Sequence, residues 1–292
     1  MKKLKLFMAL ACGVLIFALG ACSDDDDDNG TYKVESMVVD DKEQDEKTTI
    51  NFTYYDNGNM KTASELMAVP LNNDEDTPSY NSIEFEYSDM NKVAYATLRD
   101  LDNNVVGFIQ YEYDDVGDLE FMILRNVVDD PDNGVEPGDE QGRFIYRYQA
   151  TNDTETINVE YREGAPGSQN LVEAWLINYS LTNKESPTSM VNMLYSDSST
   201  PDHTYTIENI VYGSGYNSFY KQPYSYEFLD MFYKYVIESA DVTETGTGME
   251  PSKYSLRYDY TFKGRTPLTI MKNKVVGDNK TLLVSYVFSL GN

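Results

Sequence analysis

The sequence is poor in the residues that most often carry catalysis, metal binding or covalent cross-links. Its 292 residues include 2 cysteines, 1 histidine and 1 tryptophan. Cysteine-based zinc sites and disulfide frameworks need more cysteine than this chain has. Lysine and arginine number 23 against 49 aspartates and glutamates, a formal net charge of −26. Nucleic acid is excluded as a partner, because a protein that binds phosphates needs a basic surface.

Aromatic residues are abundant, with 25 tyrosines and 12 phenylalanines. Such side chains are favoured in strands. Apolar and polar residues alternate in several short segments, and this period of two predicts antiparallel strands with one buried and one solvated face. The clearest segments are residues 83–87, 144–148, 157–161, 254–260 and 283–288.

The stretches between these segments form a weak internal repeat. Each copy has a tyrosine, three further residues, and then glycine or asparagine, which tolerate the left-handed backbone of a tight hairpin turn. The copies are residues 54–60, 87–93, 113–119 and 260–265, and residues 102–104 predict one more turn. The acids in these turns are interpreted as side chains that accept hydrogen bonds from their own backbone. They are Asp56, Asp89, Asp114 and Asp115.

Three segments interrupt the alternation. Residues 129–142 and 164–169 are polar and rich in glycine and proline, so they are predicted to be loops. Apolar residues spaced three and four apart predict an amphipathic helix over about residues 224–240, packed against the sheet. Pro223 before it and Gly246 after it fit the signals for a helix start and stop.

The predicted fold class is therefore all-β. Residues 33–292 are expected to form a single domain, a long antiparallel up-and-down meander that is curved or barrel-like, with one packed helix. A barrel that spans a membrane needs an apolar outer band, whereas the alternate faces here carry charged and hydroxyl side chains. The sequence thus predicts a soluble domain attached to a membrane by other means.

The N-terminus supplies such an attachment. Lysines at positions 2, 3 and 5 precede an apolar run from Phe7 to Ala21, which is shorter than the roughly 20 residues of a membrane span. The alternative, a membrane-anchor helix, is disfavoured by this length. Residues 19–22, Leu-Gly-Ala-Cys, resemble a bacterial lipobox, so residues 1–21 are expected to be a removed signal peptide and Cys22 to be acylated. Two or more acyl chains give stable anchoring.

An acidic run follows the proposed lipid anchor and begins the linker of residues 22–32. The run resembles the surface-export signal of Bacteroidetes lipoproteins and consists of Ser23, Asp24, Asp25, Asp26, Asp27 and Asp28. The resemblance implies an outer-membrane lipoprotein that faces the cell exterior; the periplasmic face is the alternative.

The hairpin of residues 113–119 and the closing segment of residues 260–267 resemble an uncharacterised family of Bacteroidetes lipoproteins with tyrosine–aspartate–glycine hairpins. The resemblance covers residues 33–292 and implies a porin-like meander curled into an open or closed barrel. That family has no established activity, so it implies no functional residues.

The sequence offers little for catalysis, and we predict that the protein is not an enzyme. His203 lies in a polar stretch with no nucleophile elbow, so it is expected to be a loop residue. Paired carboxylates could hydrolyse glycosides, but chance pairs abound among so many acids. No cofactor is predicted. Asp129, Asp130 and Asp132 are a weak calcium candidate, because Pro131 breaks the spacing of an EF-hand loop.

Tyrosine is the feature most compatible with ligand binding, since exposed aromatic rings stack on sugars and anchor interfaces. Tyrosines are dense between residues 195 and 226, and the candidates are Tyr205, Tyr212, Tyr216 and Tyr220. Equally, tyrosine is simply a favourable strand residue. Our first hypothesis is a non-catalytic binding module for a glycan or an outer-membrane protein. The second is a structural or envelope-assembly lipoprotein without a small ligand, and the third is a carboxylate-based hydrolase.

Overall fold

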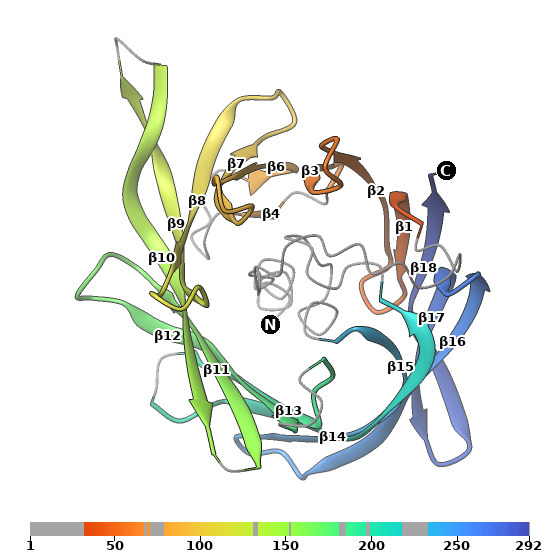
Figure 1. Cartoon of the computed structure of the whole chain (residues 1–292). Helices are drawn as coiled ribbons and strands as arrows, with labels where there is room; N and C mark the ends of the chain where they lie inside the picture. The colour runs from red at the N-terminus through yellow and green to blue at the C-terminus, as the bar shows by residue number, and fades with distance from the viewer. Residues whose placement is uncertain are drawn as a thin grey trace.

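The computed structural model describes residues 32–66, 69–70, 79–130, 134–151, 153–180, 185–196, 199–217 and 233–291. Within these ranges the backbone forms strands and turns and no helix. Sixteen strands close into one antiparallel barrel, and β4 (Val69–Pro70) and β5 (Ser79–Tyr80) form a separate small sheet. The prediction of an all-β meander is confirmed, and the meander is a closed barrel (Figure 1).

The barrel strands follow one another around the ring in chain order. They are β1 (Val34–Asp41), β2 (Glu46–Tyr54), β3 (Met60–Ser64), β6 (Ser82–Tyr87), β7 (Val93–Arg99), β8 (Val105–Tyr113), β9 (Leu119–Asp130), β10 (Gly134–Ala150), β11 (Thr154–Glu163), β12 (Asn170–Ser180), β13 (Ser189–Leu194), β14 (His203–Tyr216), β15 (Tyr235–Gly246), β16 (Ser252–Lys263), β17 (Thr266–Val276) and β18 (Asn279–Leu290). The first and last strands lie side by side in Figure 1, and their pairing, with Val39 opposite Tyr286, closes the ring.

One face of each strand is apolar and buried, as the alternation predicts. Beyond the ring the described residues form only the small β4–β5 sheet, so the face that is buried on every strand is the one that points into the barrel. Its most completely buried large side chains, all under 2% exposed, include Phe85, Phe144, Leu98, Leu124 and Ile177. The other face points outward and carries mostly hydroxyl, amide and charged side chains.

Two predictions for irregular segments are wrong. The predicted loop at residues 129–142 is largely strand, because β9 and β10 continue as a long hairpin that rises beyond the barrel wall (Figure 1). Two register shifts near Glu140 let this ribbon bend, and such bulges are invisible to a search for strict alternation. The loop predicted at residues 164–169 does connect β11 to β12.

The predicted helix over residues 224–240 is also wrong where it can be checked. Residues 235–240 belong to β15, and residues 224–232 lie outside the described ranges. Val236 and Ile237 are consecutive and both buried, opposite a run of β14 that contains several register shifts. Irregular pairing with β14 therefore produced a spacing of apolar residues that resembled a helix.

Tyrosine hydroxyls tie neighbouring strands together at one end of the barrel, which we call the tyrosine rim. Each of these tyrosines lies near the end of a strand that terminates at this rim, and its hydroxyl donates to a backbone carbonyl at or near the start of the adjacent strand. The pairs are Tyr54 to Val34, Tyr87 to Met60, Tyr113 to Val93, Tyr148 to Leu119, Tyr212 to Pro187 and Tyr260 to Ile237, with distances of 2.5–3.1 Å. The predicted tyrosine repeat is thus a structural device at this rim.

The hairpin turns at the tyrosine rim are built as the repeat predicts in three copies. In the best-defined turn, the Asp114 carboxylate accepts hydrogen bonds from the backbone N–H groups of Val116, Gly117 and Asp118 at 2.7–3.0 Å. Gly117 has a φ of 95°, and Asn91 takes the equivalent left-handed position with a φ of 60°. In the fourth copy, β16 runs on to Lys263, and the turn is Gly264 and Arg265.

Replacing Tyr113 with phenylalanine tests the role of the tyrosine rim. The change deletes the hydroxyl that donates to Val93 and should lower the free energy of unfolding by about 1 kcal/mol. Urea unfolding of the soluble chain measures this. The control is Tyr95→Phe on the outward face, where the ring is 39% exposed, and it should change stability by less than about 0.5 kcal/mol. Equal effects of the two substitutions would argue against a structural role for the hydroxyl.

Candidate functional site

A row of polar side chains crosses the largely apolar inner face on five neighbouring strands. Asn192 on β13 lies opposite Tyr205 on β14, which in turn lies opposite Glu244 on β15. Glu173 on β12 and Tyr254 on β16 flank this line. We call these five residues the inner polar row. They lie toward the ends of their strands that are farthest from the tyrosine rim.

Glu173 and Asn192 form the buried end of the inner polar row. Glu173 is 3% exposed and Asn192 is fully buried. The Asn192 Nδ2 donates to Glu173 Oε1 at 2.5 Å, whereas Asn192 Oδ1 has no hydrogen-bond partner in the part of the chain that the structure describes. Burial raises the pKa of Glu173 to about 7, although hydrogen bonds from Asn192 and Trp175 lower it in part. A carboxyl that titrates near neutrality beside an unsatisfied amide oxygen is the feature of this barrel that most resembles a functional site.

Two tyrosines and a second carboxylate form the more accessible end of the row. Tyr205, Glu244 and Tyr254 are each half-buried. Burial, followed by the Glu244 carboxylate, raises the pKa of both Tyr205 and Tyr254 to about 12, so the hydroxyls stay protonated at neutral pH. The Lys274 ammonium lies 4.1 Å from the centroid of the Tyr254 ring. This end therefore offers aromatic faces, hydroxyl groups and charges of both signs.

The structure separates the tyrosines that the sequence groups together. Tyr205 belongs to the inner polar row. Tyr212 lies near the opposite end of β14, where its hydroxyl donates to the Pro187 carbonyl at 2.8 Å. Tyr216 stacks on Tyr235 with 5.6 Å between ring centroids. Tyr220 lies outside the described residues. The candidates of β14 therefore occupy two sites at opposite ends of the strand.

The other candidate residues take no part in this site. Asp129 and Asp130 lie at the end of β9, and Asp132 is outside the described ranges. No group of three His, Cys, Asp or Glu side chains that could hold a metal ion occurs in the part of the chain that the structure describes. His203 is the first residue of β14 rather than a loop residue, so that prediction is wrong.

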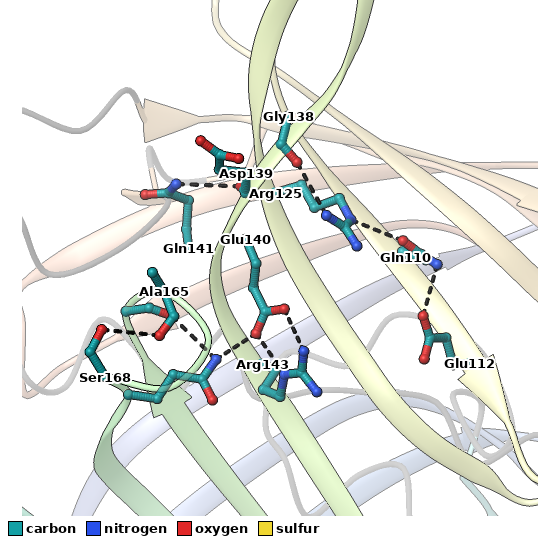
Figure 2. A network of polar contacts seen from close by, with 12 residues as sticks. Gln110, Glu112, Arg125, Gly138, Asp139, Glu140, Gln141, Arg143, Ala165 and Ser168 are labelled. Atoms are coloured by element: carbon teal, nitrogen blue, oxygen red, sulfur yellow. Dashed lines mark hydrogen bonds and ion pairs between the residues drawn. The ribbon is translucent and has the colours of Figure 1, made fainter.

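A second polar cluster, on the outward face, was missed by the sequence analysis. Glu140, whose side chain is only 4% exposed, accepts hydrogen bonds from Arg143 and from Gln169 of the β11–β12 turn (Figure 2). Arg125 donates to the Gly138 carbonyl at 3.2 Å and to the Gln110 side chain at 2.9 Å. These contacts join three hairpins at the root of the β9–β10 ribbon. Glu140 and Gln169 fell in segments predicted as loops, so no strand pattern placed them together.

The proposed anchor cannot be placed against this site. Cys22 and the acidic run from Ser23 to Asp28 lie outside the described residues. In the described part of the chain, no helix is long and apolar enough to cross a membrane.

Replacing Glu173 with glutamine tests the state of the buried carboxyl. Because the pKa is higher in the folded than in the unfolded chain, the protonated carboxyl stabilises the fold below about pH 4.5, and this contribution is lost as the pH rises through about 7. In the unsubstituted chain, the free energy of unfolding should therefore fall between pH 5 and pH 8 as Glu173 ionises. In Glu173→Gln this fall should be smaller by about 2–3 kcal/mol. Urea unfolding at the two pH values measures the change. Exposed Glu250→Gln is the control, and an unchanged pH dependence in Glu173→Gln would contradict the assignment.

The chain is similar to the crystal structures of two porin-like proteins. The one from Bacteroides vulgatus ATCC 8482 is 13% identical, has a TM-score of 0.48, and is matched over 89% of this chain and 99% of its own. The one from Bacteroides uniformis ATCC 8492 is 13% identical, has a TM-score of 0.49, and is matched over 90% of this chain and 99% of its own. No protein-family model and no curated protein matches the sequence. Neither likeness bears on what the barrel binds.

Proposed function

We propose that the protein is a lipid-anchored outer-membrane lipoprotein whose barrel stands outside the bilayer and acts as a non-catalytic binding module. The proposed ligand is a neutral carbohydrate, and the proposed site is the inner polar row. The observation that carries this proposal is the buried Asn192 Oδ1, an acceptor without a partner among the described residues, next to the Glu173 carboxyl and opposite Tyr205.

The outward face of the barrel supports a position outside the bilayer. Its side chains include a hydrogen-bonded threonine pair, Thr53 with Thr62, and an ion pair between Lys280 and Asp259 at 2.6 Å. Arg147 and Arg162 both pair with Glu160 on the same face, and Glu160 has a lowered pKa because of these arginines, despite partial burial. A transmembrane barrel has an apolar band there instead. Attachment through an acylated Cys22 is consistent with such a surface.

The chemistry of the inner polar row favours a sugar over other small ligands. Hydroxyl groups of a sugar both donate and accept, so one can donate to the Asn192 oxygen while another donates to the oxygen of the Tyr205 hydroxyl, which is itself hydrogen-bonded to Glu244. The rings of Tyr205 and Tyr254 offer apolar faces of the kind on which sugar rings stack. Because Glu173 and Glu244 could attract a positive charge, a cationic small molecule is the main alternative to a sugar as the ligand. An outer-membrane protein is the second alternative.

A structural role without a ligand is the alternative function, and one observation favours it. Six tyrosine hydroxyls at the tyrosine rim are bound to backbone carbonyls, so much of the tyrosine content serves the fold. A carboxylate-based hydrolase has less support, because the partner of the buried Glu173 is an amide rather than a second acid.

Two tyrosines on the same strand provide a matched test of binding. The mature chain is applied to a panel of dietary, host and microbial glycans, and any hit is titrated by calorimetry. Tyr205→Phe, which removes a hydroxyl from the inner polar row, should weaken the hit by about three- to tenfold. Tyr212→Phe, which removes a rim hydroxyl, should lower stability and leave affinity unchanged. Absence of any glycan hit, or equal affinity in both variants, would favour the structural alternative.

Substitution of Cys22 with alanine tests the anchor. The variant cannot be acylated, so it should move from the membrane fraction to the soluble fraction of fractionated cells, as detected by immunoblotting. Unchanged partitioning would exclude the lipobox.

Replacing residues 24–28 with alanines tests the export signal. In the same cells, this change should protect an otherwise intact lipoprotein from external protease. If protease still removes that variant, the acidic run is only a linker.

A further inference from the structure

Aromatic and cationic side chains gather at one sector of the tyrosine rim. The Arg265 guanidinium lies 3.8 Å above the Tyr216 ring and also donates to its hydroxyl at 2.7 Å. Phe262 is 42% exposed and stacks on Tyr260 with 5.5 Å between centroids. The Lys263 ammonium lies 3.9 Å from the centroid of the Tyr32 ring. We call this sector the aromatic–cation patch, and its members are Tyr32, Tyr216, Tyr235, Phe262, Lys263 and Arg265.

Among the described residues, the cations of this patch have no acidic partner, although the chain as a whole is strongly acidic. Across the described ranges, lysine and arginine form ion pairs at several places, but neither Lys263 nor Arg265 has a carboxylate within 4.0 Å. Both contact tyrosine rings instead. Cations beside half-exposed aromatic rings suit the headgroup region of a bilayer, where phosphates pair with the cations and amphipathic rings are favoured.

The chain enters the barrel at this patch. Tyr32 is the first described residue, and its backbone N–H donates to the Thr266 hydroxyl at 3.2 Å. Cys22 precedes it by ten residues, which span at most about 35 Å when fully extended. The opposite rim is farther away by the length of a strand, about 35 Å along β17 at about 3.3 Å per residue. Acyl chains on Cys22 would therefore tether the tyrosine rim within about 35 Å of the bilayer, and the opposite rim could reach the bilayer only if the linker were almost fully extended along the barrel wall.

We propose that the aromatic–cation patch is the bilayer-facing surface of the barrel and that it contacts phosphate-bearing lipid headgroups. The orientation rests on the proposed acylation of Cys22, whereas the patch rests on described contacts. In this orientation the rim nearer to the inner polar row points away from the membrane. A ligand from the surrounding medium then reaches the binding site without passing the bilayer.

Site-specific fluorescence tests this orientation. The mature chain has no cysteine besides Cys22, so one introduced thiol can be labelled with an environment-sensitive dye when Cys22 is acylated or replaced by serine. Ser214→Cys places the label beside Arg265, which donates to the Ser214 carbonyl. Met249→Cys, 45% exposed in the turn after β15, places it at the opposite rim. The acylated chain is reconstituted into vesicles of zwitterionic and anionic phospholipids that carry a headgroup spin label.

We expect the dye at position 214 to be quenched by the spin label and the dye at position 249 to keep its fluorescence. Phe262→Gln with Lys263→Gln should reduce the quenching at position 214. The matched control, Lys253→Gln near the opposite rim, should leave it unchanged. Equal quenching at the two labels, or quenching that is insensitive to the patch substitutions, would overturn the proposal.

A second arm separates this inference from the proposed anchor. The Cys22→Ser chain carries an N-terminal histidine tag and is held on vesicles that contain a nickel-chelating lipid. Quenching confined to position 214 in this arm, and reduced by Phe262→Gln with Lys263→Gln, would support the patch even if the natural chain proved not to be acylated. Equal quenching at positions 214 and 249 in this arm would overturn the patch whatever the state of Cys22.

Discussion

The pairing of β1 with β18 is the constraint on which the rest of the structure depends. It joins the first strand of the ring to the last, removes the free edges of the sheet and gives the sheet an inside. Only with an inside can the apolar face of every strand be buried without a second layer. The same closure leaves the other face in contact with the surroundings, which explains why that face is polar. Because most acidic side chains can lie on that outward face, the acidic character of the chain is compatible with a stable core.

Because consecutive strands are antiparallel, every second turn lies at the same end, and the two rims of the barrel differ in chemistry. At the tyrosine rim, hydroxyl groups of Tyr54, Tyr87 and Tyr113 hold neighbouring strand ends together through carbonyl acceptors. Lys92 reinforces one of these turns by donating to the Gly117 carbonyl and lying over the Tyr113 ring. The inner polar row lies toward the other rim. One end of the barrel is thus built for rigidity and attachment, and the other carries the proposed binding groups.

The inner polar row is costly for stability, which is a reason to connect it with function. An ionised carboxylate buried at the position of Glu173 loses its hydration, and the hydrogen bonds from Asn192 and Trp175 replace only part of it. An apolar pair would serve the core better. By contrast, the buried Glu140 on the outward face is bound by Arg143 and Gln169, so its polar contacts join the β9–β10 hairpin to the β11–β12 hairpin and need no ligand to account for them.

The sequence by itself determined the all-β class, the strands with alternating residues, and the hairpin turns around Gly58, Asn91 and Gly117, because these depend on side-chain period and local backbone preference. It also singled out Tyr205. Only the tertiary structure decided that the meander closes, that residues 235–240 are strand, and that Tyr205 lies opposite Asn192 and Glu244 while Tyr212 and Tyr216 lie elsewhere. Register between strands and bulges within them set these outcomes. Both arise from pairing with residues distant in the chain, which no local pattern records.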